Sequence, residues 1–332
     1  MRNDGSILVA LDGSEVAEGA VPCAIAIADA LRADLAFVNV WEGPTGDIRS
    51  LPIETLPQLE ADGRRACASY LEGIRDRLGR NSIRLTVVAG FADREIVKAA
   101  DEIGARAIVI ATHGRSGVTR WWYGSTASHL LRSSQQPIVA VGPHALRPIS
   151  DKLMIKRVLV PLDGSPKAEE ALSPARRLAE ALGAKLILAR CVAPAGQAYP
   201  ILAAGGYLPA MDHEIEEGAK AYLRGVAARV AAHAEDAFVL RGSSADALIQ
   251  FVETQNIDLV VMTTHARAGL ARGVLGSTAD RMLQCAAPVM LLRPEEHSGE
   301  GESGARSYCI SSARVTDGSS ADRERGRLGA SH

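Results

Sequence analysis

The chain has 332 residues, of which 47% are hydrophobic, 23% charged and 4% aromatic, and its formal net charge is −2. This length and composition are typical of a globular protein with two domains of ordinary size. The small net charge gives no electrostatic reason for nucleic acid or an anionic membrane to be a partner. No apolar run spans a bilayer and no signal-peptide pattern is present, so we expect a cytoplasmic protein.

In chain order, short apolar runs alternate with segments of helical periodicity. Two of those segments, 14–33 and 56–79, carry apolar residues at helical spacing, and Ser14 fits the N-cap of the first. The apolar runs are rich in Val and Ile with little alternation, as in strands that are covered on both faces of a parallel sheet. In the first half these predicted strands are 7–11, 35–40, 83–89, 107–111 and 138–141. Five such units with right-handed crossovers form a doubly wound α/β domain.

The second half of the chain repeats the first. The sequence ILVALDGS at 7–14 returns as VLVPLDGS at 158–165, and AIVIATHG at 107–114 returns as LVVMTTHA at 259–266. We therefore predict two tandem copies of one domain, 1–145 and 152–294. The remaining segment, 295–332, is rich in Ser, Gly, Glu and Arg and is predicted to be disordered.

The cysteines show no paired spacing. Three of the five, Cys23, Cys191 and Cys285, lie in apolar stretches, while Cys67 lies in the second predicted helix and Cys309 in the tail. Buried free thiols are therefore predicted rather than disulfides or a metal site.

Polar and small residues follow the predicted strand ends. Asp12 follows the first strand, Val40 ends the second, and 111–114 end and follow the fourth. Open α/β sheets bind ligands at this edge. The next predicted helix opens with 124–126, Gly-Ser-Thr, whose free N–H groups suit phosphate oxygens. The same three residues also suit an ordinary helix N-cap, so both interpretations stay open.

Catalytic chemistry finds little support in the sequence. His113 recurs as His265, but no Ser, Cys or carboxylate is placed by the sequence to complete a nucleophilic mechanism. The chain has no Gly-x-x-x-x-Gly-Lys-Ser/Thr loop, and no lysine lies in the candidate phosphate loop. We therefore predict no catalytic residue and no metal site.

Together these motifs resemble the universal stress protein family. The resemblance rests on Asp12-Gly13-Ser14, on Thr112-His113-Gly114 and on Gly124-Ser125, and it covers nearly all of residues 3–294 in two copies. ATP-binding members of that family carry Gly-x-x-Gly, nine residues, then Gly-Ser or Gly-Thr. The resemblance implies a five-stranded parallel sheet flanked by helices in each copy, and pairing of the copies through their last strands.

In the first copy the resemblance implies an ATP site, with or without Mg²⁺. Asp12 and the backbone of Val40 would face the adenosine, and Ala111 and Gly114 would line the ribose and phosphates. The residues that would hold the phosphates are Gly124, Ser125 and Thr126. Ala111 departs from the pattern, because it stands where the first glycine of the family motif would be.

The second copy departs further from the pattern. Its matching residues are Asp163, Cys191, Thr263, Gly276, Ser277 and Thr278, with Thr263 and Ala266 in place of both early glycines. An alanine is strained or obstructive if the backbone there has a positive φ or approaches phosphate closely. The first copy is therefore the predicted main ATP site, and the second is a weaker one.

Three functions remain to be compared. The first is a stress-response regulatory protein that binds ATP and hydrolyses it slowly or not at all. The second is a dimerisation or interaction module of the same fold without nucleotide. The third, an enzyme related to ATP pyrophosphatases, needs a Ser-Gly-Gly-x-Asp-Ser loop where this chain has Leu-Asp-Gly-Ser. The two copies can pair within one chain as a pseudo-dimer, or across chains as a homodimer, and no protein partner is identified.

Overall fold

The computed structural model describes residues 5–44, 53–112, 125–195, 209–230, 236–264 and 276–293. The first half contains β1 (Ser6–Ala10), α1 (Glu15–Glu18), α2 (Val21–Leu31), β2 (Asp34–Trp41), the 3₁₀ helix η2 (Ile53–Thr55), α3 (Leu56–Leu78), β3 (Arg84–Ala89), α4 (Ala92–Glu102), β4 (Ala105–Ala111), α5 (Ser125–Ser133) and β5 (Ile138–Val141). All five strands predicted for this half are present, each within two residues of its expected ends.

The second half repeats this order of elements. It contains β6 (Arg157–Leu162), α6 (Pro166–Glu169), α7 (Leu172–Leu182), β7 (Lys185–Val192), α10 (Pro209–Arg229), β8 (Ala237–Arg241), α11 (Ser244–Thr254), β9 (Leu259–Thr263), α12 (Ser277–Met282) and β10 (Val289–Leu292). Each half is a doubly wound α/β domain with five parallel strands, which confirms the predicted fold class.

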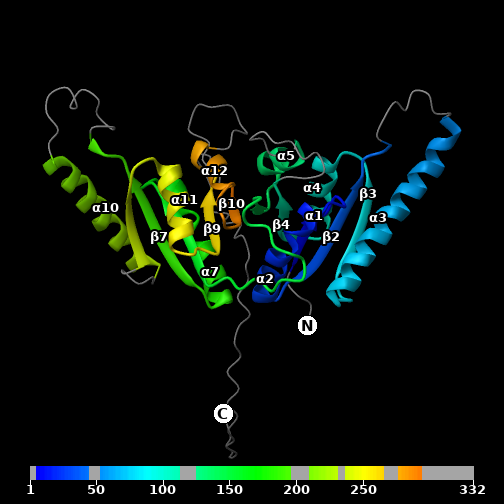
Figure 1. Cartoon of the computed structure of the whole chain (residues 1–332), viewed down its shortest axis with the longest axis horizontal. Helices are drawn as coiled ribbons and strands as arrows, with labels where there is room; N and C mark the ends of the chain where they lie inside the picture. Colours follow the sequence, from blue (N-terminus) through cyan, green and yellow to red (C-terminus); the bar gives the residue numbers. More distant parts are fainter. Residues whose placement is uncertain are drawn as a thin grey trace, which may run out of the picture.

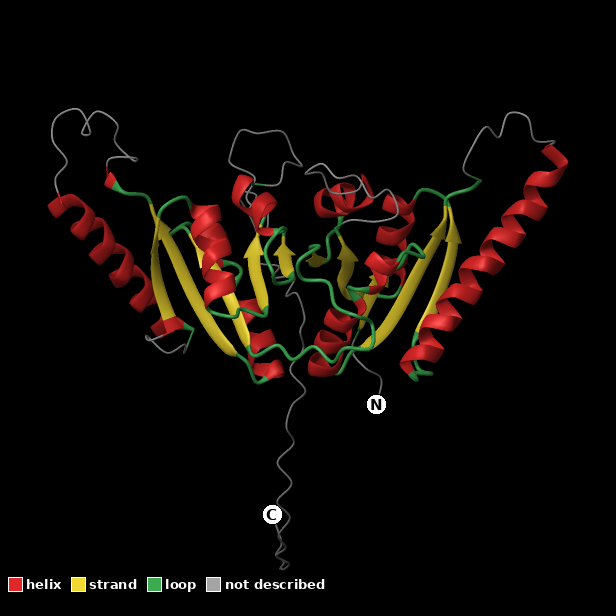
Figure 2. Cartoon of the chain, viewed as in Figure 1, coloured by secondary structure: helices red, strands yellow, loops and turns green. Residues whose placement is uncertain are grey.

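The ten strands form one continuous sheet (Figures 1 and 2). Its strand order is β3-β2-β1-β4-β5-β10-β9-β6-β7-β8. The only antiparallel pair among the described strands is β5 with β10, in which Val139 lies opposite Met290. The halves therefore join through the last strand of each, which is the pairing that the family resemblance implies.

Helices cover both faces of the sheet. On one face α2, α3, α7 and α10 pack over a core that includes Phe37 and Leu188, both fully buried. On the other face α4, α5, α11 and α12 pack over Ile108 and Leu159, which are also fully buried. Helices α2 and α7 also contact each other across the junction of the two halves. None of the described helices combines the length and apolarity that a membrane span needs.

The first predicted helix is two helices in the structure. Helix α1 ends at Glu18, and α2 begins at Val21 with Pro22 in its first turn. Proline lacks an N–H and is tolerated in a first turn but not in a helix interior, so the chain starts a new helix there. The second predicted helix is the continuous α3, which ends at Gly79 with a φ of 62°.

Candidate functional site

The loop after β1 is shaped by Asp12. Its Oδ1 accepts hydrogen bonds from the Ser14 N–H (2.9 Å) and from the Ser14 hydroxyl (2.6 Å). Ser14 Oγ in turn accepts from the Ala17 N–H at 3.1 Å, so Ser14 is the predicted N-cap of α1. Gly13 between them has a φ of 88°, a conformation that favours glycine. The carboxylate therefore has a structural role in the loop as well as a position at the sheet edge.

The strand register brings the predicted site residues of the first half together. Ala10 of β1 pairs with Val38 of β2, and Val9 pairs with Val109 of β4. Continuing both registers beyond Ala10 places Asp12 level with Val40 and just beyond the end of β4 at Ala111. Helices that follow β1 cover one face and those that follow β4 cover the other, so β1 and β4 flank the switch point where open α/β sheets bind ligands.

Part of the predicted phosphate loop lies outside the described residues. Gly114 and Gly124 fall there, as do His113, His265 and Ala266. Helix α5 begins at Ser125, where the sequence predicts it, and Thr126 in its first turn is half-buried. The start of α5 follows β4 in the chain, so its first free N–H groups belong to the same unit as Ala111.

The loop after β6 copies the loop after β1. Asp163 Oδ1 accepts from the Ser165 N–H at 2.9 Å, and Ser165 Oγ accepts from the Ala168 N–H at 3.2 Å. Gly164 has a φ of 89°, close to that of Gly13. Asp163 is exposed, whereas Asp12 is half-buried. The two loops therefore share their backbone and capping, and they differ in how enclosed the carboxylate is.

An arginine distinguishes the second loop from the first. Arg190 of β7 stacks its guanidinium over the Tyr222 ring, 4.6 Å from the ring centre. A Cβ added at Gly164 would lie 3.0 Å from the same guanidinium. The equivalent residue of the first half is Asn39, which is 5% exposed. Sequence reasoning missed Arg190, although a charged residue inside the apolar run LILARC was its signal.

The other predicted site residues of the second half belong to β9 and to the start of α12. Thr263 is 2% exposed, and its hydroxyl donates to the Lys167 carbonyl at 3.0 Å. Gly276 is the N-cap of α12 with a φ of −62° and a ψ of 146°, which any residue can adopt. Ser277 is exposed and Thr278 half-buried in the first turn of that helix.

Burial raises the pKa of three of the described thiols. Burial raises the pKa of Cys23 to about 12 and that of Cys285 to about 11. Cys191 is free, as predicted, but it is only partly buried: it lies near the carboxyl end of β7, and its thiol donates to the Ser244 carbonyl at 3.5 Å. Partial burial still raises the pKa of Cys191 to about 11. Cys309 lies outside the described residues, and the described part of the chain holds no cluster of metal-ligating side chains.

One Ser-His-Asp cluster occurs on the surface of α4 and α5. The Nδ1 atom of His129 lies 3.2 Å from the Ser133 hydroxyl and 3.4 Å from an Asp93 carboxylate oxygen. A catalytic triad needs the serine and the aspartate at different ring nitrogens. Because both contacts here are made by Nδ1, this cluster cannot relay a proton from the serine towards the aspartate.

A Glu-Tyr-Arg cluster occurs in both halves and was missed by sequence reasoning. In the second half Tyr222 donates to Glu169 at 2.8 Å and Arg229 forms an ion pair with the same carboxylate. In the first half Arg77 pairs with Glu18, and Tyr70 lies beside them on α3. Burial, then Glu18 and then Asp12, raise the pKa of Tyr70. The cluster therefore ties α3 to α1, the helix that follows the Asp12 loop, and its repetition in the sequence was the signal.

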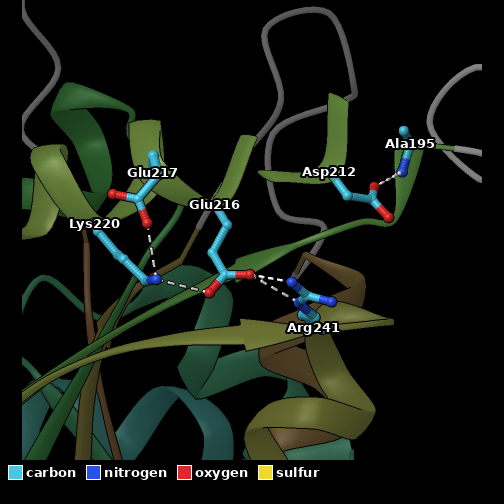
Figure 3. A network of polar contacts seen from close by, with 6 residues as sticks. All are labelled: Ala195, Asp212, Glu216, Glu217, Lys220 and Arg241. Atoms are coloured by element: carbon cyan, nitrogen blue, oxygen red, sulfur yellow. Dashed lines mark hydrogen bonds and ion pairs between the residues drawn. The ribbon is translucent and has the colours of Figure 1, made fainter. Parts of the chain in front are cut away.

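Helix α10 carries a network of charged side chains (Figure 3). Glu216 pairs with Arg241 at the end of β8 and, at 2.9 Å, with Lys220, while Lys220 also contacts Glu217 at 3.0 Å. Asp212 accepts from the Ala195 N–H at 2.7 Å beyond β7. The network therefore fixes α10 to the ends of two outer strands.

The network predicts an acid-dependent loss of stability. The hydrogen bond from Arg241, followed by that from Lys220, lowers the pKa of Glu216 from 4.5 to about 2. A depressed folded-state pKa gives stability that is present above the unfolded value and lost as the pH falls towards the folded value. We expect the unfolding free energy to fall more steeply between pH 4.5 and about 2 in the wild type than in Glu216→Gln. Urea titrations measure it, and Glu214→Gln should follow the wild type.

Trp41, next to Val40, packs against a glycine of α3. A Cβ added at Gly63 would lie 1.9 Å from the indole Nε1. Gly→Ala inside a helix normally stabilises by roughly 0.5–1 kcal/mol. We expect that gain for Gly73→Ala, where nothing lies within 4 Å, but not for Gly63→Ala, whose methyl displaces the ring. Urea unfolding and a tryptophan emission shift specific to Gly63→Ala test this, and equal gains without a shift would contradict it.

The described geometry defines a tandem doubly wound α/β protein with a related strand-end loop in each half. The model of the Universal stress protein family matches residues 5–142 and 154–293, so the chain belongs to that family. It is 27% identical over 307 residues to a universal stress protein of Mycolicibacterium smegmatis, covering 87% of this chain and 97% of that protein. It is 25% identical over 301 residues to one of Mycobacterium tuberculosis, covering 88% and 98%.

A solved universal stress protein from Archaeoglobus fulgidus has the same fold. Its TM-score is 0.60 at 16% sequence identity, and the match covers 87% of this chain and 98% of that chain. At this identity the comparison shows the tandem architecture only.

Proposed function

We propose that this protein is a stress-response regulator that binds ATP at the strand edge of its first half. The observation that supports the proposal is the convergence of Asp12, Val40 and Ala111 at the switch point between β1 and β4. The helix that follows this edge, α5, begins with Ser125-Thr126, and free N–H groups at a helix start favour phosphate. Asp12 is half-buried there, which gives a nucleoside a more enclosed contact than Asp163 offers.

The proposed role is binding rather than turnover. The Ser133-His129-Asp93 cluster lacks the geometry of a triad, and burial raises the pKa values of Cys23, Cys191 and Cys285. The candidate phosphate loop holds no lysine that could neutralise charge during phosphoryl transfer. ATP therefore acts as a ligand whose occupancy changes the protein surface, and hydrolysis is slow or absent.

Calorimetric titration with ATP, with and without Mg²⁺, tests the proposal. We expect saturable binding with one strong site per chain, because only the first half combines an enclosed aspartate with Gly114. Two equal sites would contradict the ranking of the halves. A steady-state phosphate release assay on the same protein tests turnover. Phosphate release well above the slow background rate of ATP hydrolysis would favour an enzyme.

The alternative function is a dimerisation or interaction module without nucleotide. It is favoured by the hydrogen bonds that Asp12 and Asp163 already make within their own loops. Under this alternative the strand-end loops are helix caps only, and the β5–β10 junction is the functional feature. Absence of binding at millimolar ATP would select it.

A further inference from the structure

A cavity of about 580 Å³ lies at the junction of the two halves, on the face covered by α2 and α7. It lies between the amino-terminal end of β4 and the carboxyl-terminal ends of β9 and β10, which meet because β5 and β10 are antiparallel. Its volume is in the range of small-molecule sites. Asp12 and Val40 do not line it, whereas Thr263 does. The cavity is thus separate from the proposed ATP site of the first half.

Three arginines from different elements line this cavity. Arg106 belongs to β4, Arg177 to α7, and Arg293 follows β10. Each has a hydrogen bond to a neutral oxygen: Arg106 to the Leu31 carbonyl (3.3 Å), Arg177 to the Ser173 hydroxyl (3.1 Å) and Arg293 to the Ser134 carbonyl (3.4 Å). The Nε atoms of Arg106 and Arg177 are buried without an acceptor. None of the three pairs with a carboxylate among the residues that the structure describes.

This lack of ionic partners is local. The neighbouring Arg176, on the same helix as Arg177, pairs with Glu180 at 2.8 Å, and every arginine of α3 also pairs with an acidic residue. Among the described residues that line the cavity, Glu170 is the only acidic one. Guanidinium groups near apolar walls are stabilised by an anion that accepts charge-assisted hydrogen bonds. The cavity therefore has an excess of positive charge that an anionic ligand would offset.

The rest of the wall is apolar. Leu31 of α2, Leu178 of α7 and Met290 and Leu292 of β10 face the same space. A bare inorganic anion would leave these side chains against water. A ligand with an apolar body and one acidic group would cover them and reach the arginines in the same pose.

The symmetry-related position differs from the cavity among the described residues. There the segment that links the halves packs against the first domain: Leu146 lies 3.1 Å from where a Cβ of Gly19 would be, and the Arg147 N–H donates to the Gly19 carbonyl. Glu170 is the repeat equivalent of Gly19, and it lines the cavity. After Arg293 the sequence PEEHSGEGESGAR at 294–306 offers carboxylates but no large apolar side chain, so it does not match the apolar wall.

We propose that this interdomain cavity binds a small organic anion, with a carboxylate or phosphate group held by Arg106, Arg177 and Arg293 and an apolar body against α2 and β10. Because the cavity is made by both halves, its ligand would stabilise their junction. This binding does not depend on the proposed ATP site.

Calorimetric titration with octanoate, and with octanol as the uncharged analogue, tests the proposal on the full chain. We expect saturable octanoate binding that is roughly tenfold or more weaker in Arg106→Met and in Arg177→Met. Arg293 is exposed, so Arg293→Met leaves the core packing intact. This variant should also bind octanoate more weakly than the wild type. Arg176→Met is the matched control and should bind as the wild type does, whereas Glu170→Gln should bind more tightly.

Three results would overturn the proposal. One is the absence of saturable octanoate binding by the wild type, and another is equal affinity for octanol. The third is binding that appears only in the full-length variant Glu295→Gln/Glu296→Gln, because the acidic segment would then be the ligand of these arginines. ATP binding is measured on the same variants, so failure of one site is distinguished from failure of the other.

Discussion

Gly142→Ala should destabilise the protein by about 3 kcal/mol, the upper part of the usual range for overpacking. Gly142 directly follows β5, and a Cβ added to it would lie 2.1 Å from the carbonyl oxygen of Leu283. The φ of Gly142 is not positive, so alanine has no conformational penalty there and the whole cost is steric. The clash is with backbone, which cannot rotate away as a side chain could.

The obstruction falls between the two halves. Leu283 is the C-cap of α12, and its N–H is bonded to the Ala279 carbonyl, which holds its backbone in place. Gly142 is held on its side by β5, which pairs with β10 of the other half. Relief therefore requires the two halves to move apart along the only antiparallel pair of the described strands. Besides a lower stability, we expect the two domains of Gly142→Ala to unfold less cooperatively.

Urea unfolding followed by circular dichroism measures this effect. The matched control is Gly225→Ala in α10, where nothing lies within 4 Å of an added Cβ and a gain of roughly 0.5–1 kcal/mol is expected. If the unfolding free energy of Gly142→Ala lies within about 0.5 kcal/mol of the wild-type value, the backbone at the junction can shift to make room for the methyl group. That result would contradict the predicted clash.

The sequence was sufficient for the architecture because the repeated signals agree with one another. The strand 138–141 was predicted to the residue, since Pro137 precedes it and its four residues are all apolar. The positions of Asp12 and Val40 at one edge follow from the predicted doubly wound fold, because parallel strands end at the same edge of the sheet. The break between α1 and α2 within 14–33 was missed because the apolar periodicity continues across Gly19 and Pro22.

What the sequence could not show depends on contacts between distant residues. Arg106 and Arg293 are 187 positions apart and converge only because β5 and β10 pair in the antiparallel sense. The contact of Gly142 with Leu283 has the same origin. Thr263 matches Ala111 in the repeated motif, and the sequence could not show that it also lines the interdomain cavity and donates to the Lys167 carbonyl.

Gly124→Val is expected to reduce ATP affinity by roughly tenfold or more, whereas Gly276→Val leaves it nearly unchanged. Gly124 lies outside the described residues, but its repeat equivalent, Gly276, lies within them. Gly276 has an ordinary extended conformation as the N-cap of α12. The backbone at Gly276 therefore does not require glycine. A glycine at this repeat position instead leaves room for a ligand to approach the free N–H groups of the helix.

That room matters only where the rest of a nucleotide site is present. The first half has Gly114 and a half-buried Asp12. The second half has Ala266 and an exposed Asp163, and its Gly164 lies against Arg190. A valine at 124 would thus block an occupied site, and a valine at 276 would change only a helix cap, at a cost of about 1 kcal/mol in stability. Calorimetric ATP titrations of both variants measure the difference. Equal losses of affinity would show that both halves bind ATP, and no loss in either would show that Gly-Ser-Thr serves only to cap α5 and α12.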